Sequence, residues 1–245
     1  MKKSRAEIVV ADLPASASAN VAMVCRIAER LGVVLCSQVV FVGGATTALL
    51  LTDPAALEVR PTRDVDVIVE IAGYGEYTRL SEDLRSLGFC EDVAGVICRW
   101  TVDDLVVDLM PTDPGILGFT NRWYSVAMRD AAFITLNNGK EMIVIRILPA
   151  PLFLATKLEA FSDRGKNDYY ASHDFEDMIT LIDGRQELVE EIGNQSDEVR
   201  IYLCNALREW LKMPAFSEII EAHLTDQTRL NIVLSRIRRI AMNNK

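Results

Sequence analysis

Three aspartates provide the chemistry that the sequence suggests first. Asp64 and Asp66 open an apolar run typical of a strand, and side chains alternate along a strand, so both carboxylates face the same side. Asp108 lies within a second apolar run, Leu105 to Met110, where a carboxylate is costly unless it is paired or binds a cation. Carboxylate oxygens that converge on one edge of a sheet suit Mg²⁺, and two such ions support phosphoryl or nucleotidyl transfer.

A glycine pair, Gly43 and Gly44, stands upstream of these aspartates, between a short apolar run and a segment with helical character. A strand that breaks at glycines into a helix presents backbone N–H groups to an anion. We therefore expect a phosphate cradle that leads into a metal site. There Asp64 and Asp66 hold the metal bound to a triphosphate, and Asp108 helps to hold the metal that activates an attacking hydroxyl. Taken alone, the glycines are equally explained by the steric needs of a turn, and Asp-x-Asp also occurs at solvated strand ends.

The elements that must position these residues form a mixed first half. The apolar spacing predicts helices where the period is near 3.6, and strands where short β-rich runs flank turn residues. Asp103-Asp104 and Asn137-Asn138-Gly139 each predict the turn of a β-hairpin. The predicted elements are a helix at Ser18 to Leu31, strands at Val39 to Val42 and Val65 to Ile71, a helix at Tyr77 to Leu87, and the hairpin strands Val96 to Thr101, Leu105 to Met110, Phe133 to Leu136 and Met142 to Ile147.

The second half is helical, and no strand is predicted after Pro151. We place a boundary between a catalytic domain at 1–148 and a helical C-terminal domain at 149–245. The predicted class is α+β, with a mixed β-sheet flanked by helices and followed by a helical domain. The predicted C-terminal helices are Leu152 to Phe161, Ser172 to Ile182, Gln186 to Ile192, Glu198 to Leu211 and Asp226 to Met242.

The order of these features resembles the DNA polymerase β-like nucleotidyltransferase superfamily: a glycine pair, Asp-x-Asp, then an isolated third aspartate on a strand. The block Leu154-Ala-Thr-Lys157-Leu-Glu-Ala160-Phe-x-x-Arg164, followed by His173-Asp174-x-x-Asp177, is similar to the AbiEii/AbiGii toxin-type branch. The resemblance covers approximately Val39 to Gly184. It implies the nucleotidyltransferase fold and a toxin-like enzyme that acts on RNA such as tRNA, often paired with an antitoxin protein.

Residue by residue, the resemblance implies that Gly43 and Gly44 form the phosphate-binding turn and that Asp64 and Asp66 are the metal-binding pair. It also implies that Lys157 is a catalytic lysine in contact with the triphosphate, and that Asp174 is the family's distal acidic residue at the nucleotide.

Other residues extend the predicted nucleotide site. Many relatives have a serine where this chain has Gly44, so a hydroxyl contact to the phosphate must come from Thr46 or Thr47, or be absent. Arg63, with Arg60 beside it, can reach the triphosphate from the loop before the Asp-x-Asp strand. Arg164 is seven residues from Lys157 and shares a helix face with it, so we include it among the nucleotide-binding residues.

Each of these residues also has a structural interpretation. Lys157 could place its stem on apolar surface and its amine in water. His173, one of two histidines, could do acid–base work beside Asp174, or the pair could simply begin a helix that Ser172 or Asp174 caps. Asp108 could be a solvated position on an edge strand, but its apolar neighbours leave that strand no clear polar face.

Composition limits the alternatives. The net charge of −9 argues against a surface that holds nucleic acid by bulk electrostatics. The last predicted helix carries Arg229, Arg236, Arg238 and Arg239, which could meet an RNA acceptor or an acidic partner, or form a solvated face. The five cysteines are scattered without CxxC spacing, which fits reduced core thiols and a cytoplasmic location. The charge-free run from Leu31 to Thr52 contains polar residues and glycines, so we predict no membrane span.

Three functions stay open on the sequence. The first is a Mg²⁺-dependent nucleotidyltransferase that uses two ions, takes an NTP as substrate and closes its helical domain over the nucleotide. The second is a small-molecule nucleotidyltransferase of the aminoglycoside-modifying kind, which the acidic net charge suits. The third is a nucleotide- or partner-binding protein that has lost catalysis, for which the missing serine hydroxyl is the only support.

Overall fold

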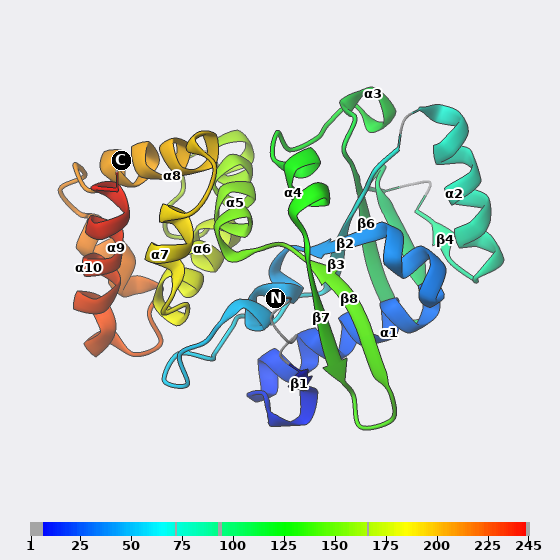
Figure 1. Ribbon diagram of the computed structural model, residues 1–245, viewed down its shortest axis with the longest axis horizontal. Coiled ribbons are helices and arrows are strands. Elements are labelled where there is room, and N and C mark those ends of the chain that lie inside the picture. Colours follow the sequence, from blue (N-terminus) through cyan, green and yellow to red (C-terminus); the bar gives the residue numbers. More distant parts are fainter. Residues whose placement is uncertain (1–6, 72, 93–94, 166, 244–245) are drawn as a thin grey trace. The chain divides into compact units, whose positions relative to one another are not determined.

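The structure, a computed structural model, describes residues 7–71, 73–92, 95–165 and 167–243. It divides into two compact units (Figure 1). The sheet unit comprises the chain up to Leu49 together with Arg60–Pro149, and the helical unit comprises Leu50–Val59 together with Ala150–Lys245. The change of unit at Pro149 lies next to the predicted boundary. The segment Leu50–Val59 was predicted within the domain 1–148 but packs with the helices, a placement that rests on contacts distant in sequence.

The sheet unit is built on one mixed sheet whose strands run in the order β1-β7-β8-β2-β3-β6-β5-β4. The pairs β1·β7, β8·β2 and β3·β6 are parallel and the other pairs are antiparallel. The predicted combination of a mixed β-sheet with helices is confirmed, and the nucleotidyltransferase fold stays a prediction. The strands are β1 (Glu7–Val9), β2 (Val39–Val42), β3 (Asp64–Val69), β4 (Cys90–Glu91), β5 (Arg99–Val102), β6 (Leu105–Pro111), β7 (Ala132–Asn137) and β8 (Met142–Ile147).

The register of the central strands decides which side chains meet. In the parallel pair β3·β6, Asp66 lies opposite Asp108, and in the antiparallel pair β5·β6, Arg99 lies opposite Asp108. Directly paired residues project to the same face, so Arg99, Asp108 and Asp66 form a row across three strands, and Asp64 lies two residues along β3 on that face. On the opposite face Val65 and Val107 are fully or almost fully buried.

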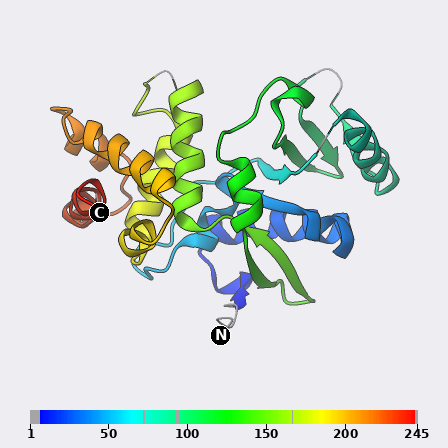
Figure 2. The ribbon, with the colours of Figure 1, turned by 45° about the horizontal axis from the view of Figure 1, so that its top comes forward.

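Helix α1 (Ala15–Gln38) packs across the sheet, on β2, β3, β6 and β8 (Figure 2). Its buried residues follow the helical period that predicted it, and the first part of the helix ends at Gly32, where the pattern predicted an end. Gly32 has φ +68° and kinks the chain, after which the helix resumes and leaves Val33 and Val34 exposed. The remaining helices of this unit are η1 (Val10–Asp12), η2 (Gly44–Leu50, whose last residue belongs to the helical unit), α2 (Tyr74–Ser86), α3 (Pro114–Leu117) and α4 (Tyr124–Asp130).

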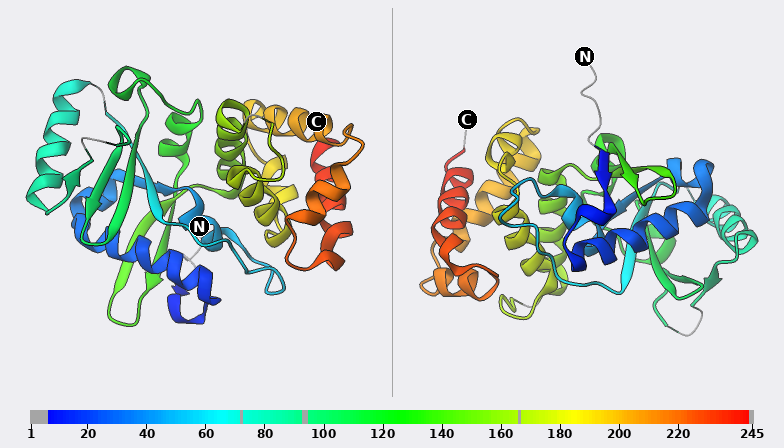
Figure 3. Two further views of the ribbon diagram at one scale, coloured as in Figure 1. Left: turned by 180° about the vertical axis from the view of Figure 1, so that it is seen from behind. Right: turned by 90° about the horizontal axis from the view of Figure 1, so that it is seen from below.

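The helical unit packs α5, α6, α8 and α10 on one another (Figure 3). No strand occurs among its described residues, as predicted. Two details differ from the prediction: α9 was missed, because seven residues show little periodicity, and the last helix begins with a separate 3₁₀ turn. The helices are α5 (Ala150–Arg164), α6 (His173–Gly184), α7 (Leu188–Gly193), α8 (Asp197–Trp210), α9 (Phe216–Ala222), η3 (Gln227–Arg229) and α10 (Leu230–Ala241).

The segment Leu50–Val59, which we call the strap, is bound to the helical unit through its backbone. The N–H groups of Thr52 and Asp53 both donate to the Gly184 carbonyl, at 2.8 and 2.9 Å. A Cβ on Gly184 would lie 2.7 Å from the Ala56 carbonyl oxygen, so this close approach requires glycine. These backbone contacts with Gly184 explain why the strap belongs to this unit.

A buried ion cluster fastens the strap further. Arg229 donates from Nη2 to Asp53 Oδ2 and from Nε to Asp183 Oδ1, both at 2.7 Å. All three side chains are at most 12% exposed. We call this group the Arg229 bridge; it joins the strap to α6 and to the turn before α10.

The cysteines are free thiols, and all but Cys90 are buried. Burial raises the pKa of Cys36 and of Cys98 to about 11, so these thiols are protonated at neutral pH. Among the helices of the described residues, none has the length and apolar character that crossing a membrane requires.

Candidate functional site

The structure brings the three predicted aspartates together on one face of the sheet. Asp64 and Asp66 come from β3, and Asp108 comes from the adjacent β6. Asp108 is only 6% exposed, whereas the Asp64 side chain is 36% exposed. The interpretation of Asp108 as a solvated residue on an edge strand is therefore wrong, because β6 lies between β3 and β5. We call Asp64, Asp66 and Asp108 the carboxylate cluster.

Arg99 is part of this site, and the sequence reasoning missed it. Its Nε donates to Asp108 Oδ1 and its Nη2 to Asp108 Oδ2, both at 2.8 Å, and Nη2 also lies 3.2 Å from Asp64 Oδ2. The hydrogen bonds to Asp108 raise the pKa of the Arg99 guanidinium, so it stays charged. The sequence did contain a signal, because counting outward equally from the Asp103-Asp104 turn brings Arg99 opposite Asp108.

A buried asparagine of α1 sets the path of the chain into β3. Asn20 is 1% exposed; its Nδ2 donates to the Arg60 carbonyl at 2.8 Å, and its Oδ1 accepts from the Thr62 N–H at 3.1 Å. The Thr62 hydroxyl then donates to Asp64 Oδ1 at 2.9 Å. Helix α1 thus fixes the loop that delivers the first aspartate. Arg63, in the same loop, has an exposed side chain, and its predicted contact with a nucleotide stays a prediction.

Gly43 brings the glycine turn against the second aspartate. Its φ of +73° favours glycine, and a Cβ there would lie 1.8 Å from Asp66 Oδ2. Its carbonyl accepts from the Thr46 N–H at 3.1 Å and from the Thr46 hydroxyl at 3.0 Å. Gly44, the next residue, begins η2. The turn therefore cannot carry a side chain at Gly43 without moving Asp66.

The predicted role of Thr46 as a phosphate contact does not fit this arrangement. Its side chain is 2% exposed and its hydroxyl already donates to the Gly43 carbonyl. The reason is local, since a threonine three residues after a turn carbonyl closes the turn with its own hydroxyl. Thr47, the other candidate, is also fully buried. Thr46 instead supports the turn that holds Gly43 close to Asp66.

The carboxylate cluster offers oxygen donors of the kind that a hard cation prefers, but its described side chains are not arranged around one. Three carboxylates share one face, and a positive group, the Arg99 guanidinium, already lies between Asp64 and Asp108. Within residues 7–71, 73–92, 95–165 and 167–243, no group of three or more His, Cys, Asp or Glu side chains is arranged to hold a metal ion. In the described arrangement Arg99 takes both oxygens of Asp108, so Mg²⁺ would need a different arrangement of these side chains.

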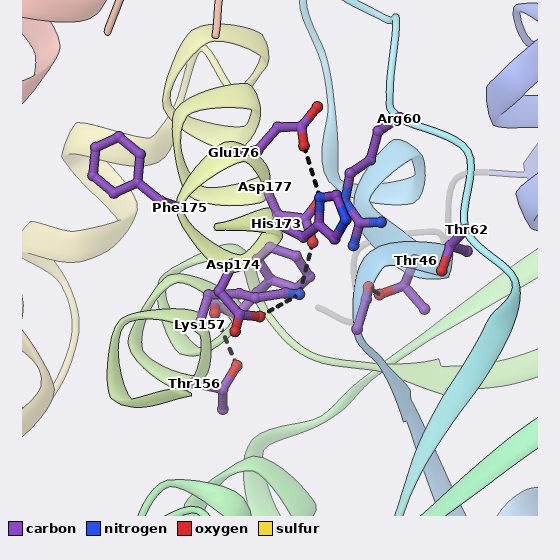
Figure 4. Close-up of polar contacts among 12 residues, drawn as sticks. Thr46, Arg60, Thr62, Thr156, Lys157, His173, Asp174, Phe175, Glu176 and Asp177 are labelled. Atoms are coloured by element: carbon purple, nitrogen blue, oxygen red, sulfur yellow. Dashed lines mark hydrogen bonds and ion pairs between the residues drawn. The ribbon is translucent and has the colours of Figure 1, made fainter. Parts of the chain in front are cut away.

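The helical unit contains the second group of predicted residues (Figure 4). Lys157 on α5 places Nζ 3.0 Å from Asp174 Oδ1 and 2.6 Å from Asp177 Oδ2, both on α6. Lys157 is only 8% exposed, so the alternative in which its amine lies in water is wrong. Arg164 donates from Nε to Asp174 Oδ2 at 3.0 Å and shares the face of Lys157, as its spacing predicted.

The charges of this group favour the ionised form of Asp174. Burial alone would raise the pKa of Asp174, but Lys157 and Arg164 outweigh it and hold that pKa below its ordinary value. The predicted contacts of Lys157, Arg164 and Asp174 with a triphosphate stay predictions. What the structure establishes is that Lys157 forms ion pairs with two carboxylates from the next helix.

Ser172 and His173 lie at the start of α6. The Ser172 hydroxyl caps the helix by accepting from the Phe175 N–H at 3.4 Å. The His173 ring is exposed and its Nδ1 lies 3.2 Å from Glu176 Oε2. The helix-start interpretation with Ser172 as the cap is confirmed.

The predicted basic face of the last helix is wrong in part. Arg229 belongs to the Arg229 bridge, and Arg236 donates to the Ile182 carbonyl at 2.9 Å. Burial lowers the pKa of Arg236. Only Arg238 and Arg239 of the four are exposed, because the other two carry the contacts between α10, α6 and the strap.

Comparison with known proteins assigns no family to this chain. No protein-family model matches the sequence, and no curated protein shows significant similarity to it.

Proposed function

We propose that this protein is a Mg²⁺-dependent nucleotidyltransferase that moves a nucleoside monophosphate from an NTP to a hydroxyl acceptor. The observation that carries the proposal is the register of β3 and β6, which places Asp66 opposite Asp108 with Asp64 on the same face. Three carboxylates on one face of a sheet supply the hard oxygen donors that two Mg²⁺ ions would need for phosphoryl transfer. The Gly43 turn beside Asp66 adds a backbone segment that can face a phosphate.

In the proposed reaction, the acceptor hydroxyl attacks the α-phosphate, a new oxygen–phosphorus bond forms, and the bond to the leaving pyrophosphate breaks. Asp64, Asp66 and Asp108 would hold Mg²⁺, which when bound neutralises phosphate charge and lowers the pKa of the attacking hydroxyl. The chain itself contributes positioning: Thr62 orients Asp64, and the Gly43 turn orients Asp66.

The acceptor follows from the resemblance to the toxin-type branch, which supports an RNA such as tRNA and an antitoxin protein as partner. The motif that carries this resemblance includes Lys157, Arg164, Asp174 and Asp177, which form one connected ion cluster in the helical unit. We retain Lys157, Arg164 and Asp174 as predicted nucleotide contacts on this basis.

A second candidate is a protein that has lost catalysis. The bidentate contact of Arg99 with Asp108 favours it, because both oxygens of that carboxylate are already used. In such a protein the arginine would permanently replace the cation.

The test is transfer of label from each of the four α-labelled NTPs in the presence of Mg²⁺, with tRNA and an aminoglycoside offered side by side. We expect labelled RNA, and loss of transfer by more than roughly a hundredfold in Asp66→Asn, since even outer-shell partners of metal ligands cost about 10- to 100-fold. Asp104→Asn is the matched control, because Asp104 is exposed in the turn between β5 and β6.

Full transfer by a folded Asp64→Ala/Asp66→Ala double variant would exclude the proposed site. Labelling of the aminoglycoside alone would identify the small-molecule enzyme instead. Binding of NTP without transfer to any acceptor would favour the protein that has lost catalysis.

A further inference from the structure

Arg99 is placed as a cation would be placed. It projects from β5 directly opposite Asp108, and its guanidinium reaches across β6 to Asp64 on β3. The carboxylate cluster is thereby bridged by a positive group supplied by the chain itself. A guanidinium binds a carboxylate through two parallel N–H bonds, which is the geometry at Asp108.

The oxygens that Arg99 uses are the ones that a metal would need. Both Asp108 oxygens accept from Arg99, and Asp64 Oδ2 faces the same Nη2 while Asp64 Oδ1 accepts from Thr62. A cation coordinated by Asp108 and Asp64 must therefore break at least part of this set. The guanidinium and the divalent ion compete for the same negative charge.

The competition is reversible in principle, because the bridge is open to water on one side. The Arg99 side chain is 29% exposed and that of Asp64 is 36% exposed. A long arginine side chain at such a position can turn its charged head into solvent while its stem stays on the protein.

We propose that Arg99 is a built-in competitor of the activating metal: it bridges Asp64 and Asp108 in the resting protein and is displaced when the divalent ion binds. This inference rests on the proposed function, since it assumes that the carboxylate cluster takes Mg²⁺. It adds to that function a residue that sets how much metal the enzyme needs.

The competition predicts the direction of the effect, and the share of molecules that form the bridge sets its size. When only a fraction of molecules has a competent site, the apparent dissociation constant rises by the inverse of that fraction. With the bridge formed in about nine molecules of ten, removing it tightens metal binding about tenfold. The tightening must appear without any NTP, because the competition involves only the protein and the ion.

The experiment measures Mn²⁺ binding by electron paramagnetic resonance to the wild type, Arg99→Gln and Arg85→Gln. Arg85→Gln is the matched control, because it removes the same charge from an exposed position of the same unit. Arg85 pairs with Glu91. We expect Arg99→Gln to bind Mn²⁺ about tenfold more tightly, and Arg85→Gln to stay within about twofold of the wild type.

A second measurement follows Arg99 in the wild type, so that the proposal does not depend on the folding of a variant. The Nε–Hε resonance of Arg99, assigned through Arg99→Lys, should shift on addition of Mg²⁺ and exchange faster with water. That change would report loss of the hydrogen bond from Nε to Asp108.

The outcomes separate this inference from the proposed function. Tighter binding in Arg99→Gln together with a shifted resonance supports the competition. Equal or weaker binding in Arg99→Gln, or a resonance that stays unchanged while Mg²⁺ binds, overturns the competition and leaves the metal site standing. Absence of divalent-ion binding in both the wild type and Arg99→Gln overturns the competition and the proposed metal site together.

Discussion

Two arginines in this protein each bridge two aspartates from different elements, and they differ in access to water. In the sheet unit Arg99 bridges Asp108 and Asp64, and we call this group the Arg99 bridge. Its arginine is 29% exposed and Asp64 is 36% exposed, whereas Asp108 is 8% exposed. In the Arg229 bridge of the helical unit, all three side chains are at most 12% exposed.

The difference in exposure distinguishes a structural ion cluster, the Arg229 bridge, from a candidate functional site, the Arg99 bridge. Removal of any one charged side chain from the Arg229 bridge would leave its buried partners unpaired. Arg229 also donates to the Asp183 carbonyl, so this bridge holds the strap to the helices. The Arg99 bridge has an exposed edge and a third carboxylate, Asp66, in the same row. Similar ion-pair chemistry is therefore structural in one unit and exchangeable in the other.

The largest effect is expected on removal of the buried arginine. Arg229→Gln leaves Asp53 and Asp183 without their shared cation, which should lower the free energy of unfolding by about 3–5 kcal/mol. Chemical denaturation monitored by circular dichroism checks this value. Arg239→Gln, at an exposed position of α10, is the control and should change little. If Arg229→Gln lowered the free energy of unfolding no more than Arg239→Gln does, the Arg229 bridge would not be structural.

The next effect concerns the turn beside Asp66. Gly43→Ala and Gly139→Ala both place a side chain at a positive φ, but only at Gly43 would the Cβ meet Asp66; nothing lies within 4 Å at Gly139. We expect Gly43→Ala to destabilise the protein by about 1–3 kcal/mol more than Gly139→Ala, because of that crowding. Thermal melting of both variants gives the difference. Equal losses would mean that the close approach of Gly43 to Asp66 carries no energetic weight.

The Arg229 bridge should also respond to acid. The hydrogen bond from Arg229 holds the pKa of Asp53 below its ordinary value, so the stability contributed by Asp53 is present above about pH 4. It is lost as the pH falls through the lowered pKa of the folded state. The difference in unfolding free energy between the wild type and Asp53→Asn, about 1–2 kcal/mol near neutral pH, should therefore shrink in acid.

Denaturation of both proteins across a pH series measures this difference, with Asp163→Asn, at an exposed position of α5, as the control for removal of one carboxylate. A wild-type advantage over Asp53→Asn that persists or grows at low pH is the contrary result.

The smallest effect on stability is expected at the open bridge. Arg99→Gln should change the free energy of unfolding by only about 1 kcal/mol, because solvent reaches the guanidinium and the Asp64 side chain. The same denaturation experiment as for Arg229→Gln compares the two. A cost at Arg99 equal to that at Arg229 would show that both bridges are structural.

Much of the carboxylate cluster could be predicted from local patterns. Alternation within Asp64-Val-Asp66 places two carboxylates on one face whatever the rest of the fold does. The apolar surroundings of Asp108 required a partner for its charge. Arg99 was missed because it is a single charged residue in a strand predicted from its apolar neighbours, and only the register set by the Asp103-Asp104 turn reveals its partner.

The strap could not be predicted, because its contacts are remote in the sequence. Asp53 and Arg229 are 176 residues apart, and neither residue type signals the pairing. In the sequence, Leu50–Val59 cannot be told from an ordinary surface loop. Similarly, β1 and α9 are too short for periodicity to detect, and β1 is recognised by its parallel pairing with β7, which is remote in the sequence.

The most direct test of the central claim is to locate a bound divalent ion in the wild-type protein. Mn²⁺, added at low stoichiometry, broadens the backbone amide resonances nearest to it in an NMR spectrum. We expect selective broadening at Gly43, Asp66 and Asp108, reversed by excess Mg²⁺, with Asp53 and Asp183 unaffected. Broadening centred on Asp53 and Asp183, or none that Mg²⁺ reverses, would contradict the assignment of the carboxylate cluster as the metal site.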